Sequence, residues 1–447
     1  NSNFTRGWGI VGPNEFPTLQ DFNAVNYTLG RVLAYLHQMG VAEWNSTQDY
    51  YSDSIVSRNG AIYRSKTGTD ASPNTGNDPD TDDGTNWDIL RSSESDNLIF
   101  AHEKGGLANA VSIIGSNEAT LVVSNTQTLT ADLIIPENIT LEVKRTGLIE
   151  DDGGGWTLTI NGNIQAGLWQ VFGDGLSVSG SPNINSVYPE WFGAKGNNNN
   201  DDTTFIQRAI DLIDDGTSGT NQIYQGYGKQ VKLCNSTYII TGQLVVAGDG
   251  ITIKGSGEVS TVIKYDCSAG SLTNSDSILF IDGTGDGSKP RARNFKLSNI
   301  YFVCSDTSDT SNNPRCIYGQ YMTRWKFEQV AINWFYYAFY LNQCYSGTFT
   351  NSAIAHCYSG SYVRRCHNVK YINVAFGTLE GDTNINASVA SQIALLLTWG
   401  TSFDTCDFEF GLTAISLQND VKNLTVTNTY FENMTNGNVL WADTGTS

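Results

Sequence analysis

Residues 327–376 read FEQVAINWFYYAFYLNQCYSGTFTNSAIAHCYSGSYVRRCHNVKYINVAF and contain one short pattern three times. In the first copy, Phe327 is followed three positions later by Val330 and two positions after that by Ile332. The copies that begin at Phe349 and Tyr371 follow at intervals of 22 residues. Further copies begin at Leu297, Phe403 and Val426. A strand pattern that returns at such a period indicates a parallel β-helix, whose coils bury one side chain above another.

A second strand and a polar column keep the same period. Leu341, Val363 and Leu395 each lie eight residues before the next copy of the pattern. The turn position of the six copies holds Asn299, Gln329, Asn351, Asn373, Thr405 and Asn428. Stacked amides about 4.8 Å apart can hydrogen-bond along such a column, so we expect an asparagine ladder. The longer interval from Tyr371 to Phe403 predicts an insertion of about ten residues.

The composition limits the classes of partner. Only 16% of the 447 residues are charged, and the net charge of −19 would repel nucleic acid and anionic lipid. Apolar runs such as 393–397 are far shorter than the roughly 20 residues of a membrane-spanning helix. The eight cysteines form no CxxC pair, which favours free buried thiols over disulfides and gives no metal site.

The first 43 residues predict a helical segment. Its apolar positions, spaced three and four apart between Pro17 and Gly40, are Phe22, Val25, Leu29, Val32 and Leu36. Thr18 is a suitable N-cap and Gly40 a suitable stop. This heptad seam predicts a helix that packs in an oligomer, and the alternative is an amphipathic helix that packs on its own domain.

Residues 44–105 form a small aromatic module followed by a linker. The module resembles chitin-binding-type modules of polysaccharide-active and phage fibre proteins through Trp44, Tyr50, Tyr51, Tyr63 and Trp87. These rings either stack on sugars or form the only core that so short a segment can build. The acidic residues of its turn are Asp78, Asp80, Asp82 and Asp83. They could chelate calcium, although a solvated loop is the simpler interpretation.

A different motif, PEWFGAKGNNNNDDTTFIQRAID, occupies residues 189–211. Residues 204–207 match a capping box, and Asp201 and Asp202 precede the helix where its dipole favours anions. The helix carries one apolar face and ends before Gly216. An open β-helix end exposes an unpaired strand, so this helix is predicted to be a lid over the first coil.

The same segment resembles the opening motif of the pectate-lyase superfamily and of phage tailspikes. The resemblance covers residues 186–265 and rests on 190–196, 201–203, 206–207 and 209–211. Residues 197–200 are asparagines, where the family usually has a Gly-Asp pair. The resemblance implies a homotrimer of right-handed parallel β-helices, located in the virion, that binds host capsule or lipopolysaccharide O-antigen.

The remaining organisation follows from the same resemblance. Residues 1–90 resemble the front of phage tail fibres, which implies attachment to tail or baseplate adaptor proteins. Residues 106–185 are predicted to be a strand-rich cap and 186–447 the β-helix. The chain stops within a coil after Trp441, so the full product is expected to continue.

A catalytic site is sought among outward-facing carboxylates, because glycoside hydrolysis needs two of them. Asp407 and Glu409 point outward from one strand, and Glu432 falls in the column of Glu409 one coil later. Like charges so close should raise at least one pKa. Glu380 and Asp382 lie in the predicted insertion and could overhang the same face. Alternatively, outward carboxylates keep a β-helix soluble.

Substrate-binding candidates surround these acids. Trp399, Tyr430 and Trp334 could line a sugar groove or serve in packing. Arg364, Arg365 and His367 form the densest basic spot, which could meet an acidic sugar or the acids of a neighbouring subunit.

The chain is therefore predicted to be a phage tailspike that binds surface polysaccharide and cleaves it by hydrolysis. The alternatives are a non-catalytic receptor-binding or structural tail fibre, and a secreted polysaccharide lyase. No calcium site with an arginine base is evident for a lyase, and no phosphate loop, zinc spacing or nucleophile elbow implies a cofactor.

Overall fold

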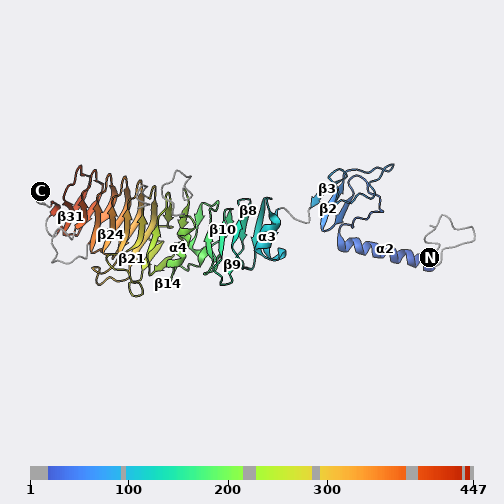
Figure 1. The fold of residues 1–447 in the computed structure, drawn as a ribbon, viewed down its shortest axis with the longest axis horizontal. Coiled ribbons are helices and arrows are strands. Elements are labelled where there is room, and N and C mark those ends of the chain that lie inside the picture. The colour runs from blue at the N-terminus through green and yellow to red at the C-terminus, as the bar shows by residue number, and fades with distance from the viewer. Residues whose placement is uncertain are drawn as a thin grey trace, which may run out of the picture. The chain divides into compact units, whose positions relative to one another are not determined.

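The computed structural model describes residues 19–91, 97–214, 228–283, 292–378, 391–434 and 438–442. The chain divides into two compact units, residues 1–98 and residues 99–447, which are described separately. Unit 1 contains one long helix and a small sheet, and unit 2 is a stack of short parallel strands (Figure 1).

The helix of unit 1 spans the predicted segment. It is α2 (Leu19–Met39), and it ends before Gly40, whose φ of 72° suits glycine. Its heptad seam is open, since Phe22, Leu29 and Val32 expose 50, 55 and 50% of their surface. Because the seam is exposed, the packing of this helix in an oligomer stays a prediction.

The small sheet of unit 1 buries the predicted aromatic residues. Strands β1 (Ile55–Arg58), β2 (Ala61–Ser65) and β3 (Trp87–Arg91) pair antiparallel in that order. Tyr50, Tyr63 and Trp87 are each at most 7% exposed and pack as one core. Tyr51 remains 44% exposed. The packing alternative therefore holds for the main aromatic set, because buried rings offer no face to a sugar.

The acidic turn of unit 1 is organised by hydrogen bonds. Asp78 forms an ion pair of 2.6 Å with Arg58, and Asp82 accepts hydrogen bonds from the backbone N–H groups of residues 84, 86 and 87. Asp80 accepts from the Tyr63 hydroxyl. These carboxylates already have partners as turn acceptors, so the calcium alternative loses its motivation.

Unit 2 is a parallel β-helix, because two long sheets run along the same stack of coils. The fourteen-stranded sheet has the main path β13 (Ser186–Val187), β15 (Gln230–Lys232), β18 (Thr252–Lys254), β21 (Lys296–Cys304), β23 (Lys326–Asn333), β25 (Thr348–Ala355), β27 (Lys370–Phe376), β29 (Ser402–Asp404) and β32 (Thr425–Thr427). Beside this path lie β14 (Asn197–Asp201), β16 (Thr237–Ile240), β19 (Val262–Tyr265), β30 (Asp407–Glu409) and β33 (Tyr430–Glu432). The eight-stranded sheet comprises β17 (Leu244–Val246), β20 (Ser277–Asp282), β22 (Arg315–Gln320), β24 (Tyr337–Asn342), β26 (Ser359–Arg364), β28 (Ser391–Leu396), β31 (Thr413–Gln418) and β34 (Asn438–Ala442).

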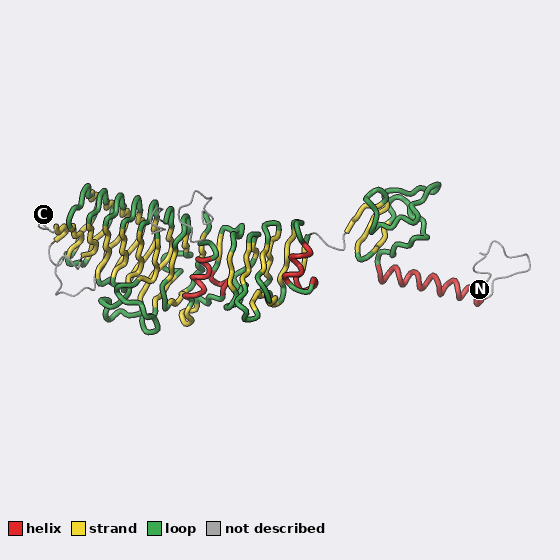
Figure 2. Tube along the Cα trace, in the orientation of Figure 1, coloured by secondary structure: helices red, strands yellow, loops and turns green. Residues whose placement is uncertain are grey.

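Three smaller sheets precede these. They are β4 (Leu98–Phe100), β5 (Ala119–Val123), β8 (Ile139–Val143) and β11 (Ile164–Gln165); β7 (Leu133–Ile135), β10 (Thr157–Ile160) and β12 (Ser177–Ser179); and β6 (Thr126–Leu129) with β9 (Leu148–Asp151). Strands β5, β8 and β11 pair in parallel, as do β7, β10 and β12. Figure 2 shows the strands of unit 2 as one continuous stack, so parallel coils already exist within residues 119–179, ahead of the predicted start at 186.

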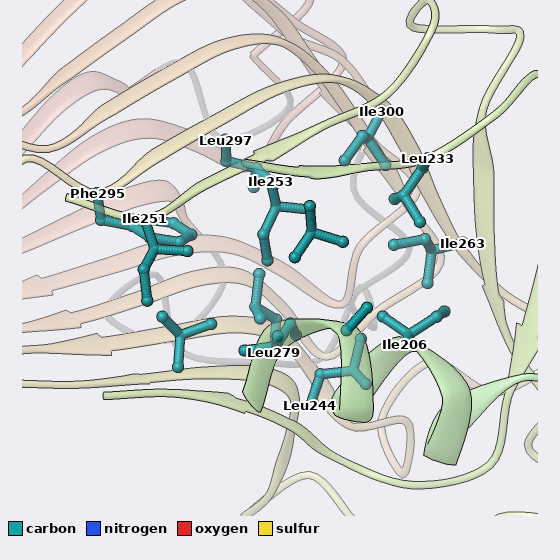
Figure 3. Packing of buried hydrophobic residues seen from close by; sticks show 14 of the residues in the cluster. Ile206, Leu233, Leu244, Ile251, Ile253, Ile263, Leu279, Phe295, Leu297 and Ile300 are labelled. Carbon is teal, nitrogen blue, oxygen red and sulfur yellow. The ribbon is translucent and has the colours of Figure 1, made fainter. Parts of the chain in front are cut away.

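The predicted register of the coils is confirmed. Phe327 pairs with Phe349, Phe349 with Tyr371, and Tyr371 with Phe403. The rings of Phe349 and Tyr371 lie 4.8 Å apart and nearly parallel, and those of Tyr371 and Phe403 repeat this distance. The second column, from Leu341 to Leu395, is also in register. Figure 3 shows the same inward packing in earlier coils, where Ile253, Leu297 and Ile300 meet in the interior.

The asparagine column has a backbone cause that the sequence analysis missed. All six residues at this turn have left-handed φ angles, from 50° to 61°. Asparagine tolerates this conformation better than other side chains with a Cβ do. The side-chain ladder exists between Asn373, which donates through Nδ2, and Asn351, which accepts through Oδ1 at 2.8 Å. The left-handed backbone of this turn therefore favours asparagine, and the hydrogen bond between stacked amides favours it further.

Helix α4 (Thr203–Asp211) lies against the middle of the solenoid instead of over its first coil. On one side Arg208 donates to the carbonyl oxygens of Gly173 and Leu176, and on the other Gln207 donates to that of Val245. The helix at the start of the coils is α3 (Leu107–Ile114), which packs on β5 after the short 3-10 helix η2 (Ala101–Lys104). The capping box was wrong: the helix begins at Thr203, and the Gln207 side chain bonds elsewhere.

Asp202 precedes this helix but serves the loop before it. Its carboxylate accepts hydrogen bonds from the backbone N–H groups of Lys195 and Gly196. The residues before it begin with a second 3-10 helix, η3 (Pro189–Phe192), whose Trp191 and Phe192 are buried. The motif thus fastens two neighbouring coils to each other.

The cysteines follow the prediction with one exception. Cys316, Cys344, Cys357, Cys366 and Cys406 are free and buried. Cys234 is free and half-buried, whereas Cys267 and Cys304 form a disulfide. In the described parts of the chain, no helix has both the length and the apolar character that crossing a bilayer requires.

Candidate functional site

The predicted acidic cluster forms on two adjacent strands of the fourteen-stranded sheet. Asp407 pairs with Tyr430 and Glu409 with Glu432 in the register of β30 and β33. Phe408, between the two acids, points inward and is fully buried. Because side chains alternate along a strand, Asp407 and Glu409 both point outward. The structure therefore brings Asp407, Glu409, Tyr430 and Glu432 together on one outer face.

The electrostatics of the cluster differ from one acid to the next. The negative charge of Asp407, followed by partial burial and the charge of Glu432, raises the pKa of Glu409. A hydrogen bond between Asp407 and Glu409 acts in the same direction. Glu432 has a separate partner, since the Tyr430 hydroxyl donates to its Oε2 atom at 3.0 Å. Glu409 is thus an acid whose pKa its neighbours raise.

The spacing of these acids suits one class of chemistry. Adjacent strands lie about 4.8 Å apart, so the backbone positions of Glu409 and Glu432 are stacked at that spacing, and retaining glycosidases hold their two carboxyl groups roughly 5 Å apart. Asp407 and Glu409, two residues apart, have Cα atoms about 6.6 Å apart. The cluster therefore contains an acid with a raised pKa next to a second carboxyl group that a tyrosine orients.

A buried glutamine supports the cluster from inside the solenoid. The Nε2 group of Gln392 donates to the backbone oxygens of Phe376, Gly377 and Glu409 at 2.9, 3.0 and 2.6 Å. Gln392 is fully buried in β28. Its amide therefore joins the end of β27, at Phe376 and Gly377, to the strand of Glu409.

Two glycines make room for this glutamine. A Cβ atom on Gly360 would lie 2.0 Å from the backbone oxygen of Gln392, and one on Gly411 would lie 2.8 Å from its Cδ atom. Neither glycine has a left-handed φ, so close approach is the reason for their presence. The sequence signal was available: Gln392 is a long polar residue directly before the apolar run IALL of strand β28.

The other predicted substrate-binding residues lie elsewhere on the coil. Arg364 ends β26 in the eight-stranded sheet, where it pairs with Leu396. Arg365 occupies the following corner with a φ of 51°, and Trp399, 38% exposed, forms bridges with His367 and Lys422. Within the described residues, no hydrogen bond or ion pair joins these side chains to the acidic cluster. The structure thus separates the cluster from a basic and aromatic corner.

The remaining candidates have different outcomes. Glu380 and Asp382 lie outside the described residues. Trp334 stacks on His356 with ring centres 4.4 Å apart, at another corner of the coil. Tyr430 is 55% exposed beside Glu432, as a residue that contacts sugar would be. Tyr430 is therefore the predicted aromatic residue that stays with the acids.

A separate pocket lies on earlier coils, away from every predicted site residue. Its volume is about 440 Å³, and Tyr188, Lys232, Cys234, Asn235 and Ser256 are among its lining residues. Burial, together with the nearby charge of Glu190, raises the pKa of the Cys234 thiol to about 11. This thiol is therefore protonated at neutral pH and is a poor nucleophile.

Among the residues that the structure describes, no group of three or more His, Cys, Asp or Glu side chains is placed to hold a metal ion.

Known proteins resemble this chain only in part. No protein-family model and no curated protein matches it. The Dettilon tailspike protein is 14% identical, with a TM-score of 0.41, and the match covers 54% of this chain and 46% of that protein. DFA-IIIase from Arthrobacter chlorophenolicus A6 in complex with DFA-III is also 14% identical, with a TM-score of 0.40, and the match covers 56% of this chain and 60% of that protein. ORF18 of Geobacillus virus E2 is 14% identical, with a TM-score of 0.34, and the match covers 56% of this chain and 61% of that protein. The chain thus spans between about half and three fifths of the lengths of these proteins.

Proposed function

We propose that this protein binds a bacterial surface polysaccharide as part of a phage tail and cleaves it by glycoside hydrolysis at Asp407, Glu409 and Glu432. The observation that carries the proposal is the in-register pair of Glu409 and Glu432, with the pKa of Glu409 raised by Asp407. Two carboxyl groups in different protonation states are what glycosidic bond cleavage requires.

The mechanism follows from the position of each acid. Glu409 donates its proton to the glycosidic oxygen, and the Glu432 carboxylate attacks the anomeric carbon as the bond to the leaving sugar breaks. Water then displaces Glu432 from the anomeric carbon, while the Glu409 carboxylate takes up a proton from that water. The charge of Asp407 raises the pKa of Glu409, which favours the protonated form that the first step needs, and the Tyr430 hydroxyl orients Glu432.

The tail assignment rests on the resemblance of the sequence to tail fibres and tailspikes, including the attachment of residues 1–90 to tail or baseplate adaptor proteins. The exposed seam of α2 supports a homotrimer in which the helices of three copies pack together. The virion location and the host capsule or O-antigen ligand belong to the same proposal.

The experiment measures cleavage of purified capsule and O-antigen. We expect new reducing ends with the wild-type protein and a fall of about 10² to 10⁴ in rate with Glu409→Gln, which keeps the shape but cannot donate a proton. Glu142→Gln, which removes an outward carboxylate from β8, is the matched control and should leave the rate unchanged. Full turnover by Glu409→Gln would refute the site.

Two measurements separate the alternatives. A non-catalytic tail fibre would bind the polysaccharide and release no reducing ends. A lyase would form a carbon–carbon double bond in the product, which ultraviolet absorbance detects, whereas hydrolysis forms none. Proton NMR of the first product tests the two-step mechanism, which predicts retention of the anomeric configuration.

A further inference from the structure

One corner of the solenoid concentrates the positive charge of the later coils. This basic corner lies between the end of each strand of the eight-stranded sheet and the start of the next strand of the fourteen-stranded sheet. It comprises residues 293–296, 323–326, 345–348, 364–370, 396–402 and 418–425. Of the nine lysines and arginines between residues 292 and 442, eight lie here, and Arg315 is the exception. In a chain of net charge −19, such clustering marks a binding surface for an anion.

A row of aromatic rings runs through the basic corner along the solenoid. Tyr345, His367, Trp399 and Lys422 follow one another as bridge partners on successive coils. The Tyr345 and His367 rings lie 4.9 Å apart, and those of His367 and Trp399 lie 4.2 Å apart. The Lys422 ammonium lies 5.9 Å from the centre of the Trp399 ring. Each successive coil therefore contributes one side chain to the row.

Of the corner cations without a carboxylate partner among the described residues, three lie on the middle coil of the row, and the other two, Lys296 and Arg324, lie on earlier coils. At the ends, Lys326 pairs with Glu328 at 2.8 Å and Lys422 with Asp420 at 2.9 Å. Within the described chain, no carboxylate pairs with Arg364, Arg365 or Lys370, which flank His367. The Nε atom of Arg364 is buried without a hydrogen-bond acceptor. This coil thus offers unneutralised guanidinium and ammonium groups beside a ring row.

From this geometry we infer that the basic corner binds an acidic polysaccharide whose sugars carry carboxylates of the uronate type. Guanidinium groups bind carboxylates in a bidentate manner, and aromatic rings stack on the apolar faces of sugars. Coils repeat about every 4.8 Å, which matches one sugar per coil in an extended chain. Nucleic acid, with one charge per roughly 1.7 Å of duplex, demands a denser positive surface.

The inference rests on the proposed function, because it names the class of substrate that reaches the acidic cluster. Trp399 and Glu409 lie on the same coil, on either side of strand β29. Ser402, at the edge of the basic corner, is five residues from Asp407, so the corner lies within about 16 Å of the cluster. A polysaccharide held at the corner can therefore place a neighbouring stretch over the acids.

Binding is tested with polygalacturonate and alginate, which carry one carboxylate per sugar, by affinity electrophoresis of the full chain. Fully methyl-esterified polygalacturonate has the same backbone without the charge and should bind at least about tenfold more weakly. Replacement of Arg364, Arg365 and Lys370 by Gln should weaken binding at least about tenfold. The matched control, in which Lys104, Arg145 and Lys264 are replaced by Gln, loses equal charge elsewhere and should bind within about twofold of wild type.

A second variant tests the ring row without a change of charge. Trp399→Ala should weaken polyuronate binding about tenfold, because the loss of one stacking contact lowers affinity by about that factor. Equal loss in the corner and control variants, or equal binding of the esterified polymer, would overturn the inference. Poly(dT) that binds as tightly as polygalacturonate would overturn it in favour of a general polyanion site. The inference would also be overturned if the corner joined copies of the chain. In that case the triple variant would have a lower molar mass in solution than the wild type, and the wild type would bind no polyuronate.

The outcome is separable from that of the proposed hydrolysis. A wild-type protein that binds polyuronate through the corner but cleaves no polysaccharide supports the inference and refutes the catalytic proposal. If the protein cleaves a neutral polysaccharide at Glu409 and the corner variants cleave it at the same rate, the result supports the catalytic proposal and refutes the inference that the corner binds the substrate.

Discussion

Replacing Gln392 by Met tests whether the interior of the solenoid holds the acidic cluster in place. The two side chains are close in length and volume, so the change removes hydrogen bonds without opening a cavity. Three backbone oxygens, those of Phe376, Gly377 and Glu409, lose the donor that Nε2 supplies. The amide has two N–H hydrogens to share among these acceptors, and a hydrogen bond contributes about 1 kcal/mol net, so the expected loss is about 2 kcal/mol in the free energy of local opening.

Hydrogen exchange measured by mass spectrometry is the assay, because it reports opening segment by segment. Peptides that cover residues 371–378 and 403–410 should lose protection in Gln392→Met, while peptides from β5 and β8 should not. Since Gln392 fixes the backbone of Glu409, the rate of polysaccharide cleavage should fall with little change in binding. Gln165→Met, an exposed position in β11, is the control and should change neither. Unchanged protection of residues 403–410 would refute the supporting role of Gln392.

Three further predictions concern a pKa, an ion pair and a turn. Asp407→Asn removes the charge that raises the pKa of Glu409, so the alkaline limb of the pH–rate profile for cleavage should move to lower pH. The hydrogen bond and charge of Arg58 lower the pKa of Asp78, so unit 1 should lose stability as pH falls below about 4, and Arg58→Gln should flatten that dependence in a fluorescence titration. Asn373, at a φ of 53°, should tolerate Gly, whereas Asn373→Val should cost about 1 to 2 kcal/mol in chemical denaturation.

The fold of the later coils was predictable because one residue type repeats at fixed intervals. Phe327, Phe349 and Tyr371 are spaced evenly, so their stacking could be inferred from the sequence alone. The earlier coils carry small aliphatic residues such as Leu121 and Leu141 at the same inward positions, and these resemble any strand-rich segment. Their membership in the solenoid depends on contacts between coils, which a single sequence does not display.

The acidic cluster was predictable for the same reason, since Glu409 and Glu432 fall in a column that the repeat defines. The basic corner was visible only in part. Arg364, Arg365 and His367 are adjacent in the sequence, whereas Trp399 and Lys422 join them only after the coils stack. Corners between strands vary in length along the chain, so their register cannot be counted from one coil to the next.

The helix around residue 205 shows how a local rule fails. The residues matched a capping box, but Gln207 bonds to the backbone of Val245 and to Asp211 because a neighbouring coil lies within reach. Asp202 likewise bonds the loop before it, where two backbone N–H groups need an acceptor. A contact with a neighbouring coil therefore outweighed the helix signal at Gln207, and a contact with the preceding loop outweighed it at Asp202.

The interval between β27 and β28 has a consequence for evolution. Strand β27 ends at Phe376 and β28 begins at Ser391, yet Val363 still pairs with Leu395, and Phe376 with Phe408. The scaffold thus absorbs an insertion at a corner without disturbing the neighbouring layers. Segments at such corners can therefore change in length and sequence during evolution while the inherited framework of coils stays unaltered.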